Sequence, residues 1–332
     1  MHIKIKFYIF LIIYSYSFSQ NEKNKYERIG FKMEKIVAKS DTIYFIYKKA
    51  KTSLPKPTII FLQGSKALPI VFFNDKKIGT ILPFKIEKYE NKFNFVIIAR
   101  KGVPLVGTYD KDSNGYVDLK GNIPDDYTKN DNLYYRTFQA KKVLNYVYRK
   151  KWCRKDSIFV IGHSEGYRVA AKLSENNNKI TKLICLSADP FNRTIDDLAK
   201  QRLECFYQNN DSTYQSSIET MNKEHFDLCK SKIDKNDFNA YNWLSYNKKF
   251  TYKSFEKFKK PLLVLYGTDD INSFHNDLLP YILNKRNISI KVYPDLDHNF
   301  FKQEYDKDGN PTERSYHWDQ VFDDIIKWII AK

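Results

Sequence analysis

Short apolar runs, separated by polar stretches with helical spacing, recur along the chain from residue 58 onward. A continuous apolar run a few residues long, bounded by turn-forming residues, is typical of a β-strand that is buried on both faces. The runs that we interpret in this way are Thr58–Leu62, Phe95–Ala99, Ile158–Ile161, Lys182–Ser187, Pro261–Tyr266 and Ile288–Tyr293. Residues 36–47 alternate loosely between apolar and polar, which predicts one or two antiparallel edge strands ahead of the first buried strand.

Helical spacing occurs between these runs and after the last of them. Apolar residues three or four positions apart predict a helix around residues 140–148, another directly after Gly166, and a strongly amphipathic one at residues 318–329. Alternating strands and helices are what an open parallel sheet with helices on both faces requires. The pattern therefore predicts an α/β fold with a mostly parallel, doubly wound sheet.

Two long stretches interrupt this alternation. Residues 100–130 are rich in Gly, Pro, Asp and Asn, which predicts a long surface loop. Residues 191–258 are polar but carry many aromatic side chains, and we expect a mostly helical insert there. Its aromatic residues either line an apolar substrate pocket or pack the insert onto the domain, and the pattern favours neither. They include Phe206, Tyr207, Tyr214, Phe226, Tyr241, Trp243 and Tyr246.

The first residues form a separate unit. A histidine and two lysines precede an apolar stretch from Phe7 to Tyr14, and small residues follow at 17–19. This order is typical of a secretory signal peptide. We therefore expect residues 1–19 to be a signal peptide, and the mature protein, residues 20–332, to be periplasmic or extracellular. The apolar core is too short to span a bilayer and no cysteine follows it, so we expect no stable membrane anchor.

The chain is basic, with 56 Lys and Arg against 39 Asp and Glu and a formal net charge of +17. A basic chain can bind nucleic acid, an anionic membrane or an acidic polymer. Here the lysines are scattered along the sequence in pairs such as Lys48-Lys49 and Lys259-Lys260, and an exported protein rarely meets nucleic acid. We therefore expect no nucleic-acid partner, and the charge alone assigns no binding surface.

The four cysteines do not predict a metal site, because they form no Cys-x-x-Cys motif and no cluster with histidine. Cys185 lies within a predicted buried strand, which indicates a packed thiol. Cys205 and Cys229 both lie in the insert, where export would permit a disulfide, but their spacing does not decide whether they pair.

The predicted strand at 158–161 runs directly into Gly162-His163-Ser164-Glu165-Gly166, a G-x-S-x-G pattern that is followed by a predicted helix. A serine on a sharp turn between strand and helix has strained backbone dihedrals, and a Cβ two positions to either side would collide with neighbouring backbone. The turn exposes the serine oxygen and directs the helix N-terminus at developing negative charge. Ser164 is therefore the candidate nucleophile.

At these residues the chain resembles the α/β-hydrolase superfamily. The resemblance runs from about Thr58 to the C-terminus, apart from the insert after Phe191. It implies a sheet of the α/β-hydrolase type, catalytic residues in the order Ser, Asp, His, and an inserted helical lid at about 191–258 that covers the nucleophile.

A serine hydroxyl becomes a good nucleophile when a base lies within hydrogen-bond reach and a carboxylate fixes the tautomer of that base. Asp270 and His298 each follow a predicted strand, at the sheet edge where ligands bind in such folds. They also come in the order that the resemblance implies. Asp270 matches the Gly-x-x-Asp pattern of relatives, while Asp269 and Asp189 remain alternatives for the acid.

The resemblance also places an oxyanion hole between two backbone amides. One is the N–H of Glu165, directly after the nucleophile at the helix N-terminus. The other comes from the loop after the first buried strand. Many relatives carry His-Gly there and this chain carries Gln63-Gly64, so that Ser65 or Lys66 would donate the N–H. We expect the Glu165 side chain to face solvent or a neighbouring loop.

Together these residues predict acyl transfer to water, a reaction that needs no metal and no organic cofactor. Ser164 would attack a carbonyl carbon while His298 takes and returns the proton. The first expectation is an exported carboxylesterase or related acyl hydrolase, acting on a small or polymer-borne ester or amide. A peptidase of the prolyl-oligopeptidase type without its propeller domain is one alternative, and a non-catalytic binding protein on the same fold is the other.

Overall fold

The computed structural model describes most of the chain after the predicted signal peptide. The described residues are 25–38, 41–74, 77–108, 115–208, 211–230 and 237–331, without the side chains of 205–208 and 211–214. The predicted signal peptide at residues 1–19 lies outside them. None of the helices in the described part of the chain is long and apolar enough to cross a membrane.

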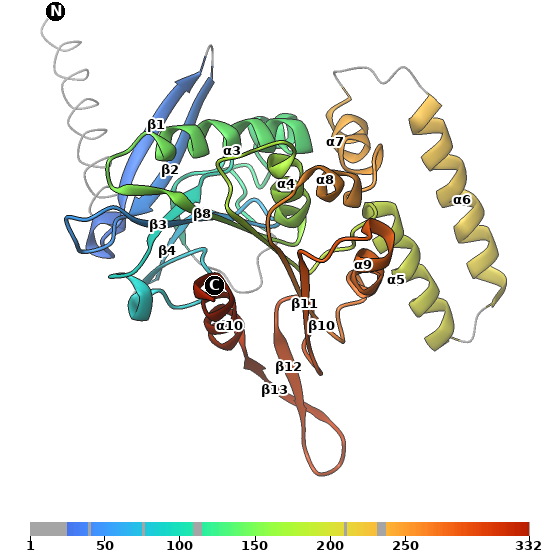
Figure 1. Cartoon of the computed structure of the whole chain (residues 1–332). Helices are drawn as coiled ribbons and strands as arrows, with labels where there is room; N and C mark the ends of the chain where they lie inside the picture. Colours follow the sequence, from blue (N-terminus) through green and yellow to red (C-terminus); the bar gives the residue numbers. More distant parts are fainter. Residues whose placement is uncertain are drawn as a thin grey trace, which may run out of the picture.

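Among the described residues, an eight-stranded sheet forms the centre of the molecule (Figure 1). In chain order its strands are β1 (Lys32–Ala38), β2 (Asp41–Lys48), β3 (Lys56–Leu62), β6 (Asn94–Ile98), β8 (Cys153–His163), β9 (Lys182–Leu186), β10 (Leu262–Gly267) and β11 (Ile288–Tyr293). Their order across the sheet is β1-β2-β6-β3-β8-β9-β10-β11. β2 pairs antiparallel with both β1 and β6, and the pairs from β6 to β11 are parallel. The mostly parallel sheet with antiparallel edge strands is therefore confirmed.

Helices cover both faces of this sheet, because successive side chains of each buried strand point to opposite sides. On one face, Ile60 and Val160 pack into a core shared with α3 (Leu133–Tyr148), α4 (Glu165–Ser174) and α8 (Tyr252–Lys257). On the other face, Ile59 and Ile161 pack with the apolar side of α10 (Trp318–Ile330), the C-terminal helix that its spacing predicted. Figure 1 shows α10 across the sheet from α3 and α4.

The stretch at 100–130, predicted as one long loop, contains regular structure. β7 (Val106–Thr108) pairs parallel with β4 (Val71–Phe73), which pairs antiparallel with β5 (Ile78–Thr80). A short helix, α2 (Asp125–Asn130), follows. The loop prediction was wrong there, because three-residue strands that pair with distant segments are too short to show a period in the sequence.

The insert is helical, as predicted. Its helices are α5 (Arg193–Gln208), α6 (Asp211–Lys230), α7 (Phe238–Asn247) and α8. In Figure 1, α5 and α6 lie at one end of the molecule, while α7 and α8 lie closer to α4. Shorter helical turns occur elsewhere at η1 (Glu87–Tyr89), η2 (Phe274–Leu278) and α9 (Leu279–Leu283).

A polar hairpin separates β11 from α10. Its strands, β12 (Phe301–Tyr305) and β13 (Pro311–Tyr316), pair antiparallel, and Figure 1 shows them projecting from the body of the molecule. Residues 304–314 are exposed along their whole length. The sequence pattern did not predict this hairpin, because Phe301, Tyr305 and Tyr316 are too widely spaced among polar residues to give the alternation by which strands are recognised.

Candidate active site

The turn between β8 and α4 holds Ser164 in a backbone conformation that ordinary residues avoid, with φ 56° and ψ −124°. The two glycines of the motif make this turn possible. A Cβ on Gly162 would lie 2.2 Å from the Gly166 carbonyl oxygen, and a Cβ on Gly166 would lie 2.0 Å from the Leu62 carbonyl oxygen. Both positions therefore exclude any side chain, as the motif predicted.

Ser164 is joined to a histidine and an aspartate by hydrogen bonds. His298, in the loop after β11, places its Nε2 atom 2.9 Å from Ser164 Oγ, and its Nδ1 atom lies 3.0 Å from Asp270 Oδ1. Because an ionised carboxylate can only accept, Nδ1 carries the proton, which leaves Nε2 free to accept the serine hydroxyl proton. The structure thus brings together the serine, base and acid candidates from loops after three parallel strands.

Asp270 is held in its ionised form. It is only 2% exposed. The Ser273 hydroxyl donates to its Oδ2 at 2.6 Å, and the Asn272 amide donates to Oδ1 at 3.1 Å. Burial on its own would raise the pKa of this carboxyl group, but the hydrogen bonds and the charge of His298 outweigh burial and lower the pKa below its usual value. A permanent negative charge therefore faces the histidine.

The two other acid candidates lie elsewhere. Asp269 is exposed and accepts a hydrogen bond from the Thr268 hydroxyl at 3.1 Å. Asp189 is buried, but its Oδ2 atom lies 2.5 Å from Nδ1 of His275, a different histidine. Of the three aspartates, Asp270 is the one whose carboxylate contacts His298.

His163, the residue before Ser164, holds the histidine loop in place. Its Nε2 atom donates to the His298 carbonyl oxygen at 3.0 Å, and its ring stands edge-on to Trp318, with centroids 5.0 Å apart. Burial, together with the nearby charge of His298, lowers the pKa of His163 to about 4. His163 is therefore neutral near pH 7 and acts as a hydrogen-bond donor rather than as a second base.

The predicted oxyanion donors lie against the nucleophile. Glu165 is the first residue of α4, so its amide N–H has no acceptor within the helix. On the other side, the loop at 63–65 approaches so closely that a Cβ on Gly64 would lie 3.2 Å from Ser164 Cβ. Ser65 and Lys66, the two alternatives for the second donor, both line the cavity beside Ser164.

That cavity measures about 280 Å³. The apolar part of its wall comes from Phe61, Leu68, Ile81, Pro83 and Trp318, and Gln63, Lys66 and Asn299 are among its polar lining residues. No residue of the insert, within the part of the chain that the structure describes, lines this cavity.

The described aromatic residues of the insert divide between the two interpretations left open: some pack onto neighbouring rings, Tyr246 and Phe250 also line a cavity away from Ser164, and Phe226 is 57% exposed. Phe191 meets Phe250 edge-on, and Trp243 meets the ring of His225. Tyr246 is 2% exposed.

Of the two surroundings expected for the Glu165 side chain, solvent or a neighbouring loop, the structure shows the second, since Arg100 in the loop after β6 pairs with it. Glu165 is 3% exposed and forms ion pairs with Arg136, with Arg100 at 3.7 Å and with Arg193 at 3.3 Å. Burial would raise the pKa of this carboxyl group, but the three guanidinium groups lower it. These partners come from α3, from the loop after β6 and from α5. The residues around Glu165 in the sequence therefore carried no signal of its burial.

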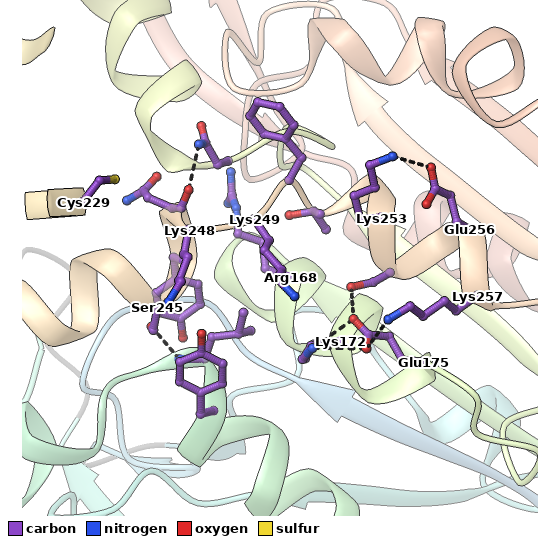
Figure 2. Close-up of a pocket in the computed structure, with 18 of the residues that line it drawn as sticks. Arg168, Lys172, Glu175, Cys229, Ser245, Lys248, Lys249, Lys253, Glu256 and Lys257 are labelled. Atoms are coloured by element: carbon purple, nitrogen blue, oxygen red, sulfur yellow. Dashed lines mark hydrogen bonds and ion pairs between the residues drawn. The ribbon is translucent and has the colours of Figure 1, made fainter. Parts of the chain in front are cut away.

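A second cavity, of about 560 Å³, lies beneath the insert and is rich in lysine (Figure 2). Its wall carries five lysines and Arg168 against two carboxylates, Glu175 and Glu256. Figure 2 shows Lys172 and Lys257 directed at Glu175, and Lys253 paired with Glu256 at 2.8 Å. The reactive arrangement lies at Ser164 instead.

The described cysteines are free thiols, and the described part of the chain shows no metal-binding cluster. Cys153 and Cys185 are buried free thiols, and Cys229 is an exposed free thiol. The side chain of Cys205, its possible partner, lies outside the description. Among the described residues, no group of three or more His, Cys, Asp or Glu side chains is placed to hold a metal ion.

Comparison with known proteins shows the fold. No protein-family model matches the sequence, and no curated protein matches it. The structure is similar to Est1E from Butyrivibrio proteoclasticus, at 13% identity and a TM-score of 0.52, over 90% of this chain and 99% of that one. It is also similar to Porphyromonas gingivalis dipeptidyl peptidase 4, at 11% identity and a TM-score of 0.52, over 90% of this chain and 35% of that one.

A third neighbour is Pyrococcus horikoshii acylaminoacyl peptidase, at 13% identity and a TM-score of 0.51, over 90% of this chain and 41% of that one. The chain thus spans less than half the length of these two peptidases. At such low identities the likeness shows the fold, which is that of the α/β-hydrolases, as predicted.

Proposed function

We propose that this chain is a serine hydrolase that transfers an acyl group to water, and that carboxylic esters with short acyl chains are its substrates. One observation carries the proposal. A continuous line of hydrogen bonds joins Asp270 to His298 and His298 to Ser164, and the serine is held at φ 56°. A strained backbone is retained where the surrounding structure over-determines it, most often at functional sites.

The geometry supports the following steps. His298 Nε2 takes the hydroxyl proton as Ser164 Oγ attacks the carbonyl carbon, and Asp270 stabilises the imidazolium that forms. The carbonyl oxygen becomes an oxyanion, which faces the Glu165 amide and the amide of the loop at 63–66. The imidazolium then protonates the leaving alcohol. Water attacks the acyl-serine by the same route, which releases the acid and restores the serine.

The cavity beside Ser164 supports a small acyl group. Its volume of about 280 Å³ falls just below the range of roughly 300–1,000 Å³ found for pockets that enclose drug-sized ligands. Its apolar wall suits an alkyl or single aromatic group. Est1E matches this chain over most of both lengths.

Labelling with a fluorophosphonate probe tests the reaction class. Wild-type protein should be labelled at Ser164, the label should map to the peptide that contains this residue, and Ser164→Ala should not be labelled. A wild-type protein that folds but remains unlabelled would favour the non-catalytic alternative.

A substrate panel then tests the substrate class. We expect p-nitrophenyl acetate and butyrate to be hydrolysed with higher kcat/KM than p-nitrophenyl octanoate, and aminoacyl p-nitroanilides to react slowly. A preference for the anilides would instead assign the peptidase alternative.

We also propose that the protein is exported. The positive start, short apolar core and small residues at 17–19 support a cleaved signal peptide. Protein recovered from the periplasm or the medium should begin near Gln20. Recovery of the intact N-terminus from Met1 would contradict this proposal.

A further inference from the structure

Three consecutive carbonyl groups in the loop at 63–65 each accept a hydrogen bond from a buried side chain. The Arg136 guanidinium donates to the Gln63 carbonyl, and the Arg100 guanidinium donates to the Gly64 carbonyl at 2.8 Å. The Tyr127 hydroxyl donates to the Ser65 carbonyl. Each of these donors is at most 7% exposed. Contacts from α2, α3 and the loop after β6 therefore hold the three peptide units of this loop in one orientation.

Fixing a carbonyl group also fixes the amide on the other side of the same peptide unit. In a trans peptide, the C=O of one residue and the N–H of the next point in opposite directions. Because Arg100 holds the Gly64 carbonyl, the Ser65 N–H must point away from Arg100. Tyr127 fixes the Lys66 N–H in the same way, through the Ser65 carbonyl. A cation on the carbonyl oxygen also polarises the peptide unit, which makes its N–H a stronger donor.

The same arginines reach the other predicted oxyanion donor. Both Arg100 and Arg136 pair with the carboxylate of Glu165, whose own amide opens α4 beside Ser164. Arg100 also pairs with Asp131. A single buried ion cluster therefore connects the loop at 63–65 to the helix N-terminus.

The positive charge of Arg136 is maintained inside the protein. Burial would lower the pKa of Arg136, but Tyr246, Glu165 and Asp131 act against burial, and the net shift is upward. With Arg193, three guanidinium groups face two carboxylates. The excess of positive charge favours the build-up of negative charge on a nearby carbonyl oxygen.

We propose that Arg100 is a positioning residue for the oxyanion hole, acting on the Ser65 amide through the Gly64 carbonyl and on Glu165 through its carboxylate. This inference rests on the proposed function. It assigns Ser65 rather than Lys66 as the second donor, because the cation sits on the peptide unit that carries the Ser65 N–H.

The test compares Arg100→Met with Arg168→Met. Arg168 is a matched control: its side chain is also 4% exposed, and it forms a buried ion pair with Asp196 at 2.8 Å. It lies on α4, and its described hydrogen bonds and ion pairs do not reach the loop at 63–65. For both variants we would measure kcat and KM on p-nitrophenyl acetate, inhibition by a trifluoromethyl ketone and the pH profile of kcat/KM.

Arg100→Met should lower kcat by about 10²-fold, because loss of one oxyanion donor costs about 10²–10³ in kcat. KM should change by less than about threefold, since the loss falls on the transition state. The trifluoromethyl ketone, whose adduct carries an oxyanion, should bind more weakly by a similar factor. The pH profile should keep its shape, because His298 and Asp270 are untouched. Arg168→Met should retain kcat within about threefold.

The outcomes separate this inference from the proposed function. If wild-type protein is active and a folded Arg100→Met variant keeps kcat and inhibitor affinity within threefold, the inference is overturned while the serine hydrolase assignment stands. If wild type shows neither labelling nor hydrolysis, the proposed function itself fails.

Two further variants complete the test. If Arg100→Met does not fold, Arg100→Lys decides, because it keeps the charge but loses the planar fork that reaches Gly64, Asp131 and Glu165 together. A fall in kcat of at least about tenfold supports the proposal, and a smaller fall contradicts it. Tyr127→Phe should cost less than Arg100→Met, and the reverse order would assign Lys66 as the donor.

Discussion

Replacing Asp270 by asparagine should abolish most hydrolytic activity, although a side chain of the same size still lies beside His298. The amide group of asparagine can donate to Nδ1 of His298, which would move the imidazole proton to Nε2, the atom that must accept the proton of Ser164. A trapped tautomer of this kind lowers kcat by about 10⁴-fold in a serine-histidine-aspartate site. At about 1.36 kcal/mol per decade, that corresponds to roughly 5.5 kcal/mol of activation free energy.

The structure supplies a control matched in burial and in chemistry. Asp189 is 1% exposed, against 2% for Asp270, and its carboxylate also contacts a histidine, His275. Burial raises the pKa of Asp189, whereas the pKa of Asp270 is lowered, so Asp189→Asn should lower the free energy of unfolding by less than Asp270→Asn while leaving kcat within about threefold. Asp269→Asn, at an exposed position, should change neither quantity measurably.

The assay is initial-rate hydrolysis of p-nitrophenyl acetate at saturating substrate, with urea unfolding of each variant in parallel. The reasoning is refuted if Asp189→Asn is the inactive variant while folded Asp270→Asn keeps more than about a tenth of wild-type kcat. In that case the acid would lie one loop earlier in the sheet.

The lowered pKa of Asp270 also predicts how stability responds to acid. Its folded pKa lies below the unfolded value of 3.8. The carboxylate therefore contributes stability above that value and loses it as the pH falls through the folded pKa. Asp270→Asn should accordingly flatten the acid loss of stability below about pH 4.

Three further predictions follow from the geometry around the site. Gly166→Ala should destabilise the protein by about 3 kcal/mol or more in urea unfolding. The new Cβ would lie 2.0 Å from the Leu62 carbonyl oxygen, and a backbone atom cannot rotate away. An unchanged unfolding midpoint would contradict the packing of α4 on β3. His163 has a folded pKa of about 4 against 6.5 unfolded, so about 3 kcal/mol of stability, complete above pH 6.5, should be lost as the pH falls to 4. His163→Gln, which still donates to His298, should remove that loss, and an identical pH dependence in both proteins would disprove it. Replacing residues 200–236 with a short linker should leave the ratio of kcat/KM on acetate, butyrate and octanoate esters unchanged; an altered ratio would show that the insert closes over the cavity.

Much of the fold and the core of the candidate site follow from local sequence patterns. Buried parallel strands are apolar on both faces, so runs such as Ile158–Ile161 indicate them without reference to the rest of the chain. Gly162 is required by backbone approach within its own turn, and Gly166 by the approach of the Leu62 carbonyl group on β3. Asp270 and His298 stand directly after strands, where parallel sheets place their ligands.

Other features depend on contacts between distant residues, which leave no local pattern. The sequence left open whether the Glu165 side chain faces solvent or a neighbouring loop, because its partners Arg100, Arg136 and Arg193 are distant in the sequence. Likewise, β7 exists because it pairs with β4. The position of Glu165 directly after the nucleophile does not indicate burial by itself. Its burial follows from the three arginines that surround its carboxylate.

The β12–β13 hairpin is a suitable place to insert a tag with which export can be followed. It projects from the molecule between the His298 loop and α10. The Asp297 carboxylate holds the His298 loop by accepting a hydrogen bond from the Phe301 amide at 2.9 Å, and the apolar side of α10 is buried. At the far end of the hairpin a Cβ on Gly309 would meet nothing within 4 Å. A peptide epitope or a small fluorescent protein inserted there should therefore leave both anchors in place. Such a tag would survive removal of the first residues, so the destination of the mature protein could be followed in living cells while the same molecules are assayed for hydrolysis.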